Sequence, residues 1–372
     1  MMTTGTLTFH AAHNYGSMLQ AYALQHYLSS LGIANEIIDL RPAAQAGMYR
    51  PFRLLPAKSF PNFLQHLLDL RFKKALDRKW ARFERFRAEE LRCTRPFLSG
   101  EELMRDLPVF DDYLVGSDQV WNVEAGDFDW SYFLPFAAGN ALSYAPSFGP
   151  GGCRSGLESC RDRVKDCLSR FKAVSVRERG GAALLKELCG IDATVLVDPT
   201  LLLSREEWES HLGDASPVRP GYILLYSPSV YTPEILRMAR EAAHKTGRRV
   251  LLTNPIDGRL RFAALGFDKV FDCGPWEFLR LLHDADLVLT TSFHAVVFSL
   301  LFERPFYAFR DYRDQRIGDL LSATALTDRL LRPGETGWED PFHADFSAVA
   351  PFLAQERARS RDFLLQNLSR HD

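Results

Sequence analysis

Three side chains that can carry acid–base or anion chemistry each stand shortly after an apolar run. His294 follows the run 287–289 and three small polar residues, Arg177 ends a second run, and Asp118 lies three residues past a third. Imidazole and carboxyl groups transfer protons, and a guanidinium binds phosphate or carboxylate. Apolar runs of this kind predict buried parallel strands, and α/β proteins bind ligands at the carboxyl ends of such strands. The spacing therefore predicts an anion-binding site with an acid–base group.

Each of these side chains also has an ordinary structural role that the sequence leaves open. His294 could cap a helix or fill a polar gap, as lone histidines often do. Asp118 could cap the next turn, and Arg177 could be a surface arginine. Other stretches of the chain must decide between these roles.

Two polar segments add candidate binding residues. One follows the predicted strand 112–115 and combines glycine, which lets the backbone approach a ligand closely, with hydrogen-bonding side chains. The other opens a predicted helix that ends at Gly32; it could hold an anion or a sugar hydroxyl, or simply cap the helix. The candidate residues are Gly116, Ser117, Gln119, Trp121 and Asn122 in the first segment, and Asn14, Tyr15, Gly16 and Ser17 in the second.

The sequence offers little support for a metal site. His10 and His13 form an HxxH pattern without a visible third ligand. The six cysteines contain no CxxC pair, and three of them recur every seven residues, which on a helix is too far apart for one disulfide or metal. We therefore expect small buried cysteines and no metal or other cofactor.

Length and composition narrow the class of protein. A chain of 372 residues fits two domains of ordinary size. With 45 basic and 47 acidic residues there is no global charge to favour nucleic acid as a partner. No run approaches the ~20 apolar residues of a membrane span, so we expect a soluble, cytoplasmic protein.

Predicted strands and helices alternate twice along the chain. This pattern indicates an α/β protein with two Rossmann-like domains that face each other across a cleft. We place the first domain at 1–212, with an amphipathic helical insertion at about 60–92, and the second at 213–345. A final helix at 346–372 could pack back on the first domain.

The predicted insertion carries an unusual charge. Between Arg71 and Arg92 the chain has nine basic and four acidic residues, with aromatic residues near helical spacing. Such a helix can lie on an anionic membrane surface, so a peripheral contact with the membrane is one interpretation. We favour the other, in which the aromatic side packs on the helix's own domain.

Six ordered segments together carry a resemblance to a known family. They are TLTFHAAHNYGSMLQAYALQHYL, DYLVGSDQVWN, ALSYAPSFG, AVSVRERG, VLVDPTLLL and ADLVLTTSFHAVVFSLLF. Together they resemble the polysaccharide pyruvyl transferase family over about residues 6–329. The resemblance implies a two-domain fold similar to GT-B glycosyltransferases. It also implies transfer of the enolpyruvyl carbons of phosphoenolpyruvate to a sugar, commonly as a ketal across positions 4 and 6 of a hexose.

The same resemblance implies a donor site. The family's site is described as an Arg-Leu-His sequence plus an arginine from the first domain. His294 matches the histidine and Arg177 is the plausible first-domain arginine, but Ser292 and Phe293 stand where Arg and Leu are expected. Losing a guanidinium from a trianion's site should cost about 1.5–3 kcal/mol unless another cation replaces it. The candidate replacements are Arg310, Arg313 and Arg316.

These assignments lead to a mechanistic hypothesis. His294 binds the donor phosphate and acts as acid, Arg177 clamps the donor, and Asp118 is the base for the attacking hydroxyl. Trp121 offers a flat surface to the sugar, with Asn14 or Asn122 as a hydroxyl partner. Helix N-termini and arginines neutralise the phosphate without a metal. We expect a lipid-linked sugar as the acceptor.

Two other functions remain compatible with the sequence. A GT-B-type glycosyltransferase would need a base-stacking and ribose site for a nucleotide sugar in the second domain. A non-catalytic sugar- or anion-binding relative would bind ligands without releasing phosphate, and Ser292 in place of arginine keeps this possibility open.

Overall fold

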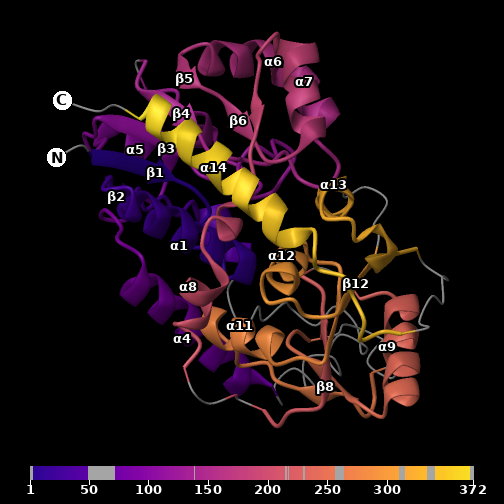
Figure 1. Cartoon of the computed structure of the whole chain (residues 1–372). Coiled ribbons are helices and arrows are strands. Elements are labelled where there is room, and N and C mark those ends of the chain that lie inside the picture. Colours follow the sequence, from indigo (N-terminus) through magenta and orange to yellow (C-terminus); the bar gives the residue numbers. More distant parts are fainter. Residues whose placement is uncertain are drawn as a thin grey trace.

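The computed structural model describes residues 3–48, 72–137, 139–213, 216, 218–228, 231–255, 264–309, 315–332 and 340–368. Within these ranges the chain forms two open sheets in which neighbouring strands run parallel. The strand orders are β2-β1-β3-β4-β5 and β10-β9-β8-β11-β12-β13, and β6 and β7 form a separate parallel pair. Figure 1 shows one sheet in each half of the molecule.

The elements of the first half run from the amino terminus to residue 209. The strands are β1 (Thr3–Leu7), β2 (Ala34–Ile37), β3 (Asp112–Val115), β4 (Ala141–Ser143), β5 (Phe171–Ala173), β6 (Ser175–Val176) and β7 (Thr194–Val195). The helices are α1 (Tyr15–Ser30), α2 (Ala43–Met48), α4 (Lys73–Glu90), α5 (Gly100–Arg105), α6 (Arg154–Leu168), α7 (Arg179–Cys189) and α8 (Arg205–Glu209), with 3₁₀ turns η1 (Trp130–Phe133) and η2 (Pro199–Leu201).

The elements of the second half follow the same alternation. The strands are β8 (Tyr222–Tyr226), β9 (Arg249–Leu252), β10 (Asp268–Lys269), β11 (Leu287–Thr290), β12 (Phe306–Phe309) and β13 (Leu330–Leu331). The helices are α9 (Pro233–Thr246), α11 (Pro275–His283), α12 (Phe293–Leu301), α13 (Gln315–Ala323) and α14 (Val349–Asn367), with the 3₁₀ turn η3 (Thr327–Arg329).

The central strands of the second sheet, β8 and β11, are buried throughout. The sheet is therefore covered on both faces. Alternate residues of β8 point to opposite faces. Tyr222, Leu224 and Tyr226 belong to the apolar cluster that contains α11 and α12, whereas Ile223 and Leu225 belong to the cluster that contains α9. The side chains of this continuous apolar strand therefore contribute to two hydrophobic cores, one on each face of the sheet.

The first sheet is built on the same principle. Leu114 of β3 packs with Leu24 of α1 and Leu364 of α14 on one face. Its neighbour Val115 packs with Leu157 of α6 and with α7 on the other. The four helices therefore cover the sheet on both sides and leave the carboxyl ends of its strands to the loops.

Core-like packing joins the two domains. The ring of Tyr15 in α1 stacks on Phe278 of α11, with centroids 4.1 Å apart and planes 3° apart. The Tyr15 hydroxyl donates to the Cys273 carbonyl at 3.2 Å. Tyr22 meets the ring of Trp276 edge to face at 5.2 Å. One apolar cluster thus runs from the first helix of the first domain into the second domain.

The basic helix α4 also spans the two domains. Phe83 and Phe86 are buried in the interdomain cluster. Arg78 Nε donates to the Asp272 carboxylate at 3.0 Å, and Arg82 donates to the Asp272 carbonyl at 2.6 Å. The helix therefore packs on both domains rather than on its own alone, while residues 60–71 of the predicted insertion lie outside the described residues. Among the described helices, none combines the length and apolar composition needed to cross a bilayer.

The last helix returns across the first domain. Its start, Val349, lies in the interdomain cluster, and its end, Leu364, lies against the first sheet. Ser360 accepts a hydrogen bond from the buried Tyr144 hydroxyl at 2.9 Å. In Figure 1 the helix runs obliquely from the second half of the molecule to the first.

Some strand bounds differ from the sequence-based expectation. The predicted strand 173–176 is divided, because β5 ends at Ala173 and Ser175 belongs to β6. The hydroxyl of Ser143 donates to the Ser175 carbonyl and accepts from its N–H, so a side chain replaces the strand ladder there. The strand β1 begins at Thr3 rather than at the expected Thr6.

We expect Tyr15→Ala to lower the free energy of unfolding by about 3–5 kcal/mol, because it leaves a cavity against Phe278 at the domain interface. Tyr15→Phe keeps the stacked ring and loses only the hydrogen bond to Cys273, which should cost about 1 kcal/mol. Urea denaturation followed by tryptophan fluorescence measures both losses. A small loss for the alanine variant would contradict the structural role of this ring.

Candidate functional site

Each sheet reverses its strand order at one place. In the first sheet β1 lies between β2 and β3, and in the second β8 lies between β9 and β11. Open α/β sheets bind ligands in the crevice outside such a reversal, at the carboxyl ends of the strands. Asp118 follows β3, and His294 follows β11. The expected site residues therefore stand where the topology places a ligand.

Local hydrogen bonds hold His294 in the first turn of α12. Ser292 is the N-cap and accepts from the Ala295 N–H at 3.3 Å. The Ser292 N–H donates to the Thr290 hydroxyl at 2.9 Å, and that hydroxyl donates to the Tyr226 carbonyl at 2.8 Å. A small polar residue at 292 thus fixes the strand-to-helix turn, which accounts for serine at this position in terms of local structure.

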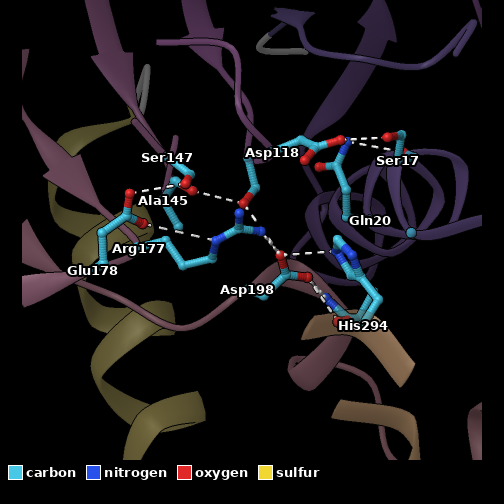
Figure 2. Close-up of polar contacts among 12 residues, drawn as sticks. Ser17, Gln20, Asp118, Ala145, Ser147, Arg177, Glu178, Asp198 and His294 are labelled. Carbon is cyan, nitrogen blue, oxygen red and sulfur yellow. Dashed lines mark hydrogen bonds and ion pairs between the residues drawn. The ribbon is translucent and has the colours of Figure 1, made fainter. Parts of the chain in front are cut away.

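A shared carboxylate brings His294 and Arg177 together from different domains. Arg177 Nη1 donates to Asp198 Oδ2 at 2.6 Å, and His294 Nε2 lies 3.3 Å from the same oxygen (Figure 2). The side chains of Arg177, Asp198 and His294 are 2%, 0% and 12% exposed. The imidazole therefore stands nearest to solvent, with the carboxylate and the guanidinium behind it.

Asp198 is ionised in this environment. Its second oxygen accepts from the Thr200 N–H at 3.0 Å and from the Thr200 hydroxyl at 2.7 Å. Burial alone would favour the neutral acid, but the charges of His294 and Arg177 and the hydrogen bond from Thr200 outweigh it. Together they hold the pKa of the Asp198 carboxyl well below its ordinary value.

Two nitrogen atoms of the Arg177 guanidinium donate no hydrogen bond to the described residues. Its Nε and Nη2 atoms have no hydrogen-bond partner among the described residues, although both are buried. The guanidinium lies over the Phe293 ring, 4.7 Å from the centroid, and Arg316 lies 5.6 Å from the same centroid. Buried N–H groups without partners are rare in proteins, and an anionic ligand would satisfy them.

Several of these groups line a cavity of about 380 Å³, whereas His294 stands just outside its wall. Arg177, Glu178 and Asp198 form its wall on the first domain, and Phe293 and Arg316 form its wall on the second. The carboxyl-terminal helix α14 closes another side. The structure thus brings Arg316, one of the three candidate cations, to the same ring as Arg177, whereas Arg310 and Arg313 lie outside the described residues.

The first turn of α1 connects Asp118 with His294. The Ser17 hydroxyl donates to Asp118 Oδ2, and Asp118 adopts a left-handed backbone conformation with φ 73°. One residue earlier, Gly16 lies so close to His294 that a Cβ there would overlap the imidazole. Glycine is therefore required at position 16 for the imidazole to reach Asp198.

The other predicted ligands have local roles that leave their contact with substrate a prediction. Asn14 is the N-cap of α1 and accepts from the Gly16 N–H at 2.9 Å. Ser117 donates to the Ala145 carbonyl at 2.6 Å. Gly116 packs against Thr8, where a Cβ would lie 2.8 Å away. Gln119 and Asn122 lie against Gly149, at the loop after β4.

Two predicted binding residues belong to the core instead. Trp121 is fully buried; its ring stacks on Phe133 and its Nε1 donates to the Tyr132 carbonyl at 2.9 Å. The interpretation of Trp121 as a surface for a sugar ring is therefore wrong. Tyr15 is buried in the domain interface on Phe278, so it does not present its ring to a ligand either.

The HxxH histidines diverge. His10 Nε2 lies 2.8 Å from Asp39 Oδ1, and His13 Nε2 lies 2.8 Å from Glu84 Oε1. Cys93 lies near His10 and Asp39, which gives a group with metal-ligand spacing. Arg41, however, binds both carboxylate oxygens of Asp39, so a guanidinium already fills the place of a cation.

Sequence patterns did not single out two residues of the site. Asp198 lies in an Asp-Pro-Thr segment that has the form of a local cap, and one of its oxygens does cap η2. Glu178 lies beside Arg177 and lines the cavity. Only their place after predicted strands at 194–197 and 173–176 could have drawn attention to them.

Comparisons with known proteins identify the family and the fold. The model of the polysaccharide pyruvyl transferase family matches residues 14–311. No curated protein matches the sequence.

Several solved structures share the fold. A UDP-GlcNAc 2-epimerase from Rickettsia bellii has a TM-score of 0.53 at 9% identity, over 98% of this chain and 95% of that one. The epimerase from Neisseria meningitidis bound to UDP-GlcNAc has a TM-score of 0.51 at 11% identity, over 99% of each chain. That from Methanocaldococcus jannaschii in complex with UDP-GlcNAc and UDP has a TM-score of 0.50 at 13% identity, over 95% and 99%. At such identities the likeness shows the fold alone, and it confirms the expected two-domain, GT-B-like α/β architecture.

We expect Asp198→Asn to lower the free energy of unfolding by about 3–5 kcal/mol near neutral pH, because Arg177 and His294 lose their buried counter-ion. The folded-state pKa of Asp198 is depressed, so its contribution is full above the unfolded pKa of about 3.9 and declines as the pH falls below it. Urea denaturation of both proteins between pH 7 and 3 tests this. A difference that stays constant or grows on acidification would contradict it.

Proposed function

Because this chain belongs to the polysaccharide pyruvyl transferase family, we propose that it moves the enolpyruvyl carbons of phosphoenolpyruvate onto a sugar and forms a pyruvate ketal. One observation carries the proposal. The buried Arg177 guanidinium, held by the same carboxylate as His294, keeps two N–H groups without a partner among the described residues beside a cavity. An anionic donor would complete this arrangement.

The donor is placed by its two anionic groups. A carboxylate or phosphate can bind the Nε and Nη2 edge of Arg177 with two parallel hydrogen bonds. Arg316, which faces the same Phe293 ring, supplies the second guanidinium that the sequence lacks at position 292. The phenyl ring forms an apolar floor beneath both cations and excludes water there. Arg316 therefore supports the assignment of phosphoenolpyruvate despite the serine.

Ketal formation sets the proton balance. A proton adds to the methylene carbon of the donor, and a sugar hydroxyl forms a bond to the adjacent carbon. The carbon–oxygen bond to phosphate breaks, and a second hydroxyl bonds to the same carbon. The two hydroxyls lose two protons, which replace the one given to the methylene carbon and supply the one that leaves with phosphate. The site thus needs a proton donor and a proton acceptor.

We assign the proton on the methylene carbon to His294. Histidine is the side chain that gains and loses protons near neutral pH, and this imidazole is the least buried member of the Asp198 group. Asp198 Oδ2, 3.3 Å from Nε2, holds the ring in place. The acceptor is a sugar, which we propose is lipid-linked, and catalysis takes place in the cytoplasm.

The structure favours this donor over a nucleotide sugar. In the second domain, the carboxyl ends of β8 and β9 are the expected place for a nucleotide. There Lys79 of α4 donates to Asn254 at 2.7 Å, and Asn254 donates to the Ser227 carbonyl at 3.0 Å. The Lys79 ammonium also lies over the Tyr15 ring. A helix from the first domain therefore lies over the second domain's crevice.

We expect saturating phosphoenolpyruvate to raise the melting temperature, because a ligand at one hundred times its Kd adds about 2.7 kcal/mol of stability. UDP-GlcNAc at the same concentration should leave the melting temperature unchanged. Phosphate release in the presence of a panel of lipid-linked oligosaccharides then identifies the acceptor. Stabilisation by UDP-GlcNAc and not by phosphoenolpyruvate would refute the proposed donor.

Two substitutions test His294 by different routes. His294→Ala should lower the rate of phosphate release by about 10²–10⁴-fold, since the proton donor is lost. Gly16→Ala keeps the imidazole but places a methyl group in its position, so it should reduce turnover to a similar extent. Circular dichroism should show a folded protein in both cases. Wild-type turnover in either folded variant would remove His294 from the mechanism.

A further inference from the structure

A second cavity lies beyond Glu178. It measures about 260 Å³, and Glu178 and Arg316 belong to its wall as well as to that of the first cavity. The rest of the wall comes from the loop 149–152, from α7 as far as Glu187, and from Arg154 and Gln315. Pockets for drug-sized ligands usually measure about 300–1,000 Å³. The size therefore suits a single sugar ring and not a nucleotide.

Glycine forms much of this wall. Gly149 has φ +82°, and a Cβ there would lie 2.6 Å from Asn122 Nδ2 and 3.0 Å from Gln119 Oε1. The loop therefore rests on two side chains of the segment that follows β3. At Gly151, by contrast, a Cβ would meet no described atom within 4 Å. A glycine-lined wall leaves backbone groups open to the hydroxyls of a ligand.

The two oxygens of the Glu178 carboxyl have different surroundings. Oε1 accepts from the Ser147 hydroxyl and from the Phe148 N–H, both at 2.8 Å. Oε2 forms an ion pair with Arg177 Nε at 3.9 Å but accepts no hydrogen bond from the described residues, although Glu178 is only 6% exposed. The residue occupies the N-cap position of α7 without capping the helix. The carboxyl is thus held by one oxygen and offers the other to the cavities.

The surroundings make Glu178 a stronger base than an exposed carboxylate. Burial raises the pKa of its carboxyl, although Arg177, Arg316 and the two hydrogen bonds act in the opposite direction. The other charged groups that line the two cavities are Arg177, Arg179 and Glu187 on the α7 side, Asp198 after β7, Arg154 of α6, Arg316 and Asp319 of α13, and Glu356 and Arg359 of α14.

We propose that the second cavity is the acceptor site, where a hexose residue donates a hydroxyl hydrogen bond to Oε2 of Glu178, and that this oxygen takes the hydroxyl proton during transfer. The catalytic half of this proposal rests on the proposed function. In Figure 2, Glu178 lies on one side of Arg177, and Asp198 with His294 lies on the other. A donor on Arg177 therefore has the acceptor on one side and the proton donor on the other.

The protons balance over the two bond-forming steps. His294 gives a proton to the methylene carbon, the first hydroxyl oxygen bonds to the adjacent carbon, and its proton goes to Glu178. As the bond to phosphate breaks, Glu178 returns that proton to the leaving phosphate. The second hydroxyl then bonds to the same carbon and its proton goes to His294. Both side chains regain their starting states.

Glu178 is better placed for this role than Asp118. Asp118 Oδ2 already accepts the Ser17 hydroxyl, whereas Oε2 of Glu178 accepts no hydrogen bond from the described residues. Glu178 lines both cavities, so it is the carboxylate that adjoins donor and acceptor at once. Asp118 then holds the first turn of α1, which positions His294 through Gly16.

Sugar binding tests the cavity without the donor. In saturation-transfer NMR with a panel of methyl hexopyranosides, wild type should bind at least one sugar. Gly151→Leu, which places a bulky side chain on the wall of the cavity, should abolish the signal. Gly151→Ala is the matched control, since a single methyl group there meets no described atom, and it should bind as wild type does. Binding that survives Gly151→Leu, or no binding of any sugar, overturns the acceptor site.

Kinetics test the proton acceptor. Glu178→Gln keeps the shape and the hydrogen bond from Phe148, and it should lower kcat for phosphate release by about 10²–10⁴-fold with little change in the KM for phosphoenolpyruvate. Wild-type kcat should fall at acid pH as Glu178 takes up a proton, and the variant should lack this fall. The role of Glu178 is overturned if Glu178→Gln has a kcat near that of wild type. It is also overturned if the fall of kcat at acid pH disappears in Asp118→Asn and not in Glu178→Gln.

The two tests separate the proposals. If wild type releases no phosphate from phosphoenolpyruvate with any acceptor, the proposed function fails and the proton role of Glu178 fails with it. The sugar-binding comparison still decides the acceptor site, because it requires neither donor nor turnover.

Discussion

The site depends on one buried carboxylate that serves two cations. Asp198 contacts Arg177, from the first domain, and His294, from the second. Charges attract far more strongly away from water than in it, and a buried charge without a partner is costly. Each of the three side chains therefore requires the other two. Through them, the end of β6 and the start of α12 are held in register across the domain boundary.

Packing between the two domains stabilises this relative position of β6 and α12. Domains within one chain usually meet through polar surfaces and move relative to each other. Here α1 packs on α11 through the stacked rings of Tyr15 and Phe278, and α4 adds Phe83 and Phe86 to the same cluster. Separating the domains would expose this cluster to water, which would cost free energy. The packing therefore favours the arrangement in which Arg177 and His294 share Asp198.

The sequence predicted the places where strands end, since apolar runs stop at small polar residues, and with them the positions of His294 and Arg177. It could not predict how far a side chain reaches. Trp121 follows a strand as a sugar platform would, yet its contacts are with Tyr132 and Phe133, on a 3₁₀ turn that no periodicity reveals. Asp198 has the form of a cap, and the pattern cannot show that its other oxygen, Oδ2, faces Arg177 and His294.

The helix α14 has a consequence for how the chain folds. Leu364 completes a core whose other members lie in α1 and β3, so this core joins residues that are far apart in the sequence. Contacts of this kind slow folding, because a long stretch of chain must close before they can form. Before α14 docks, the first domain exposes the apolar side chains of Leu24 and Leu114, together with the Tyr144 hydroxyl that later donates to Ser360.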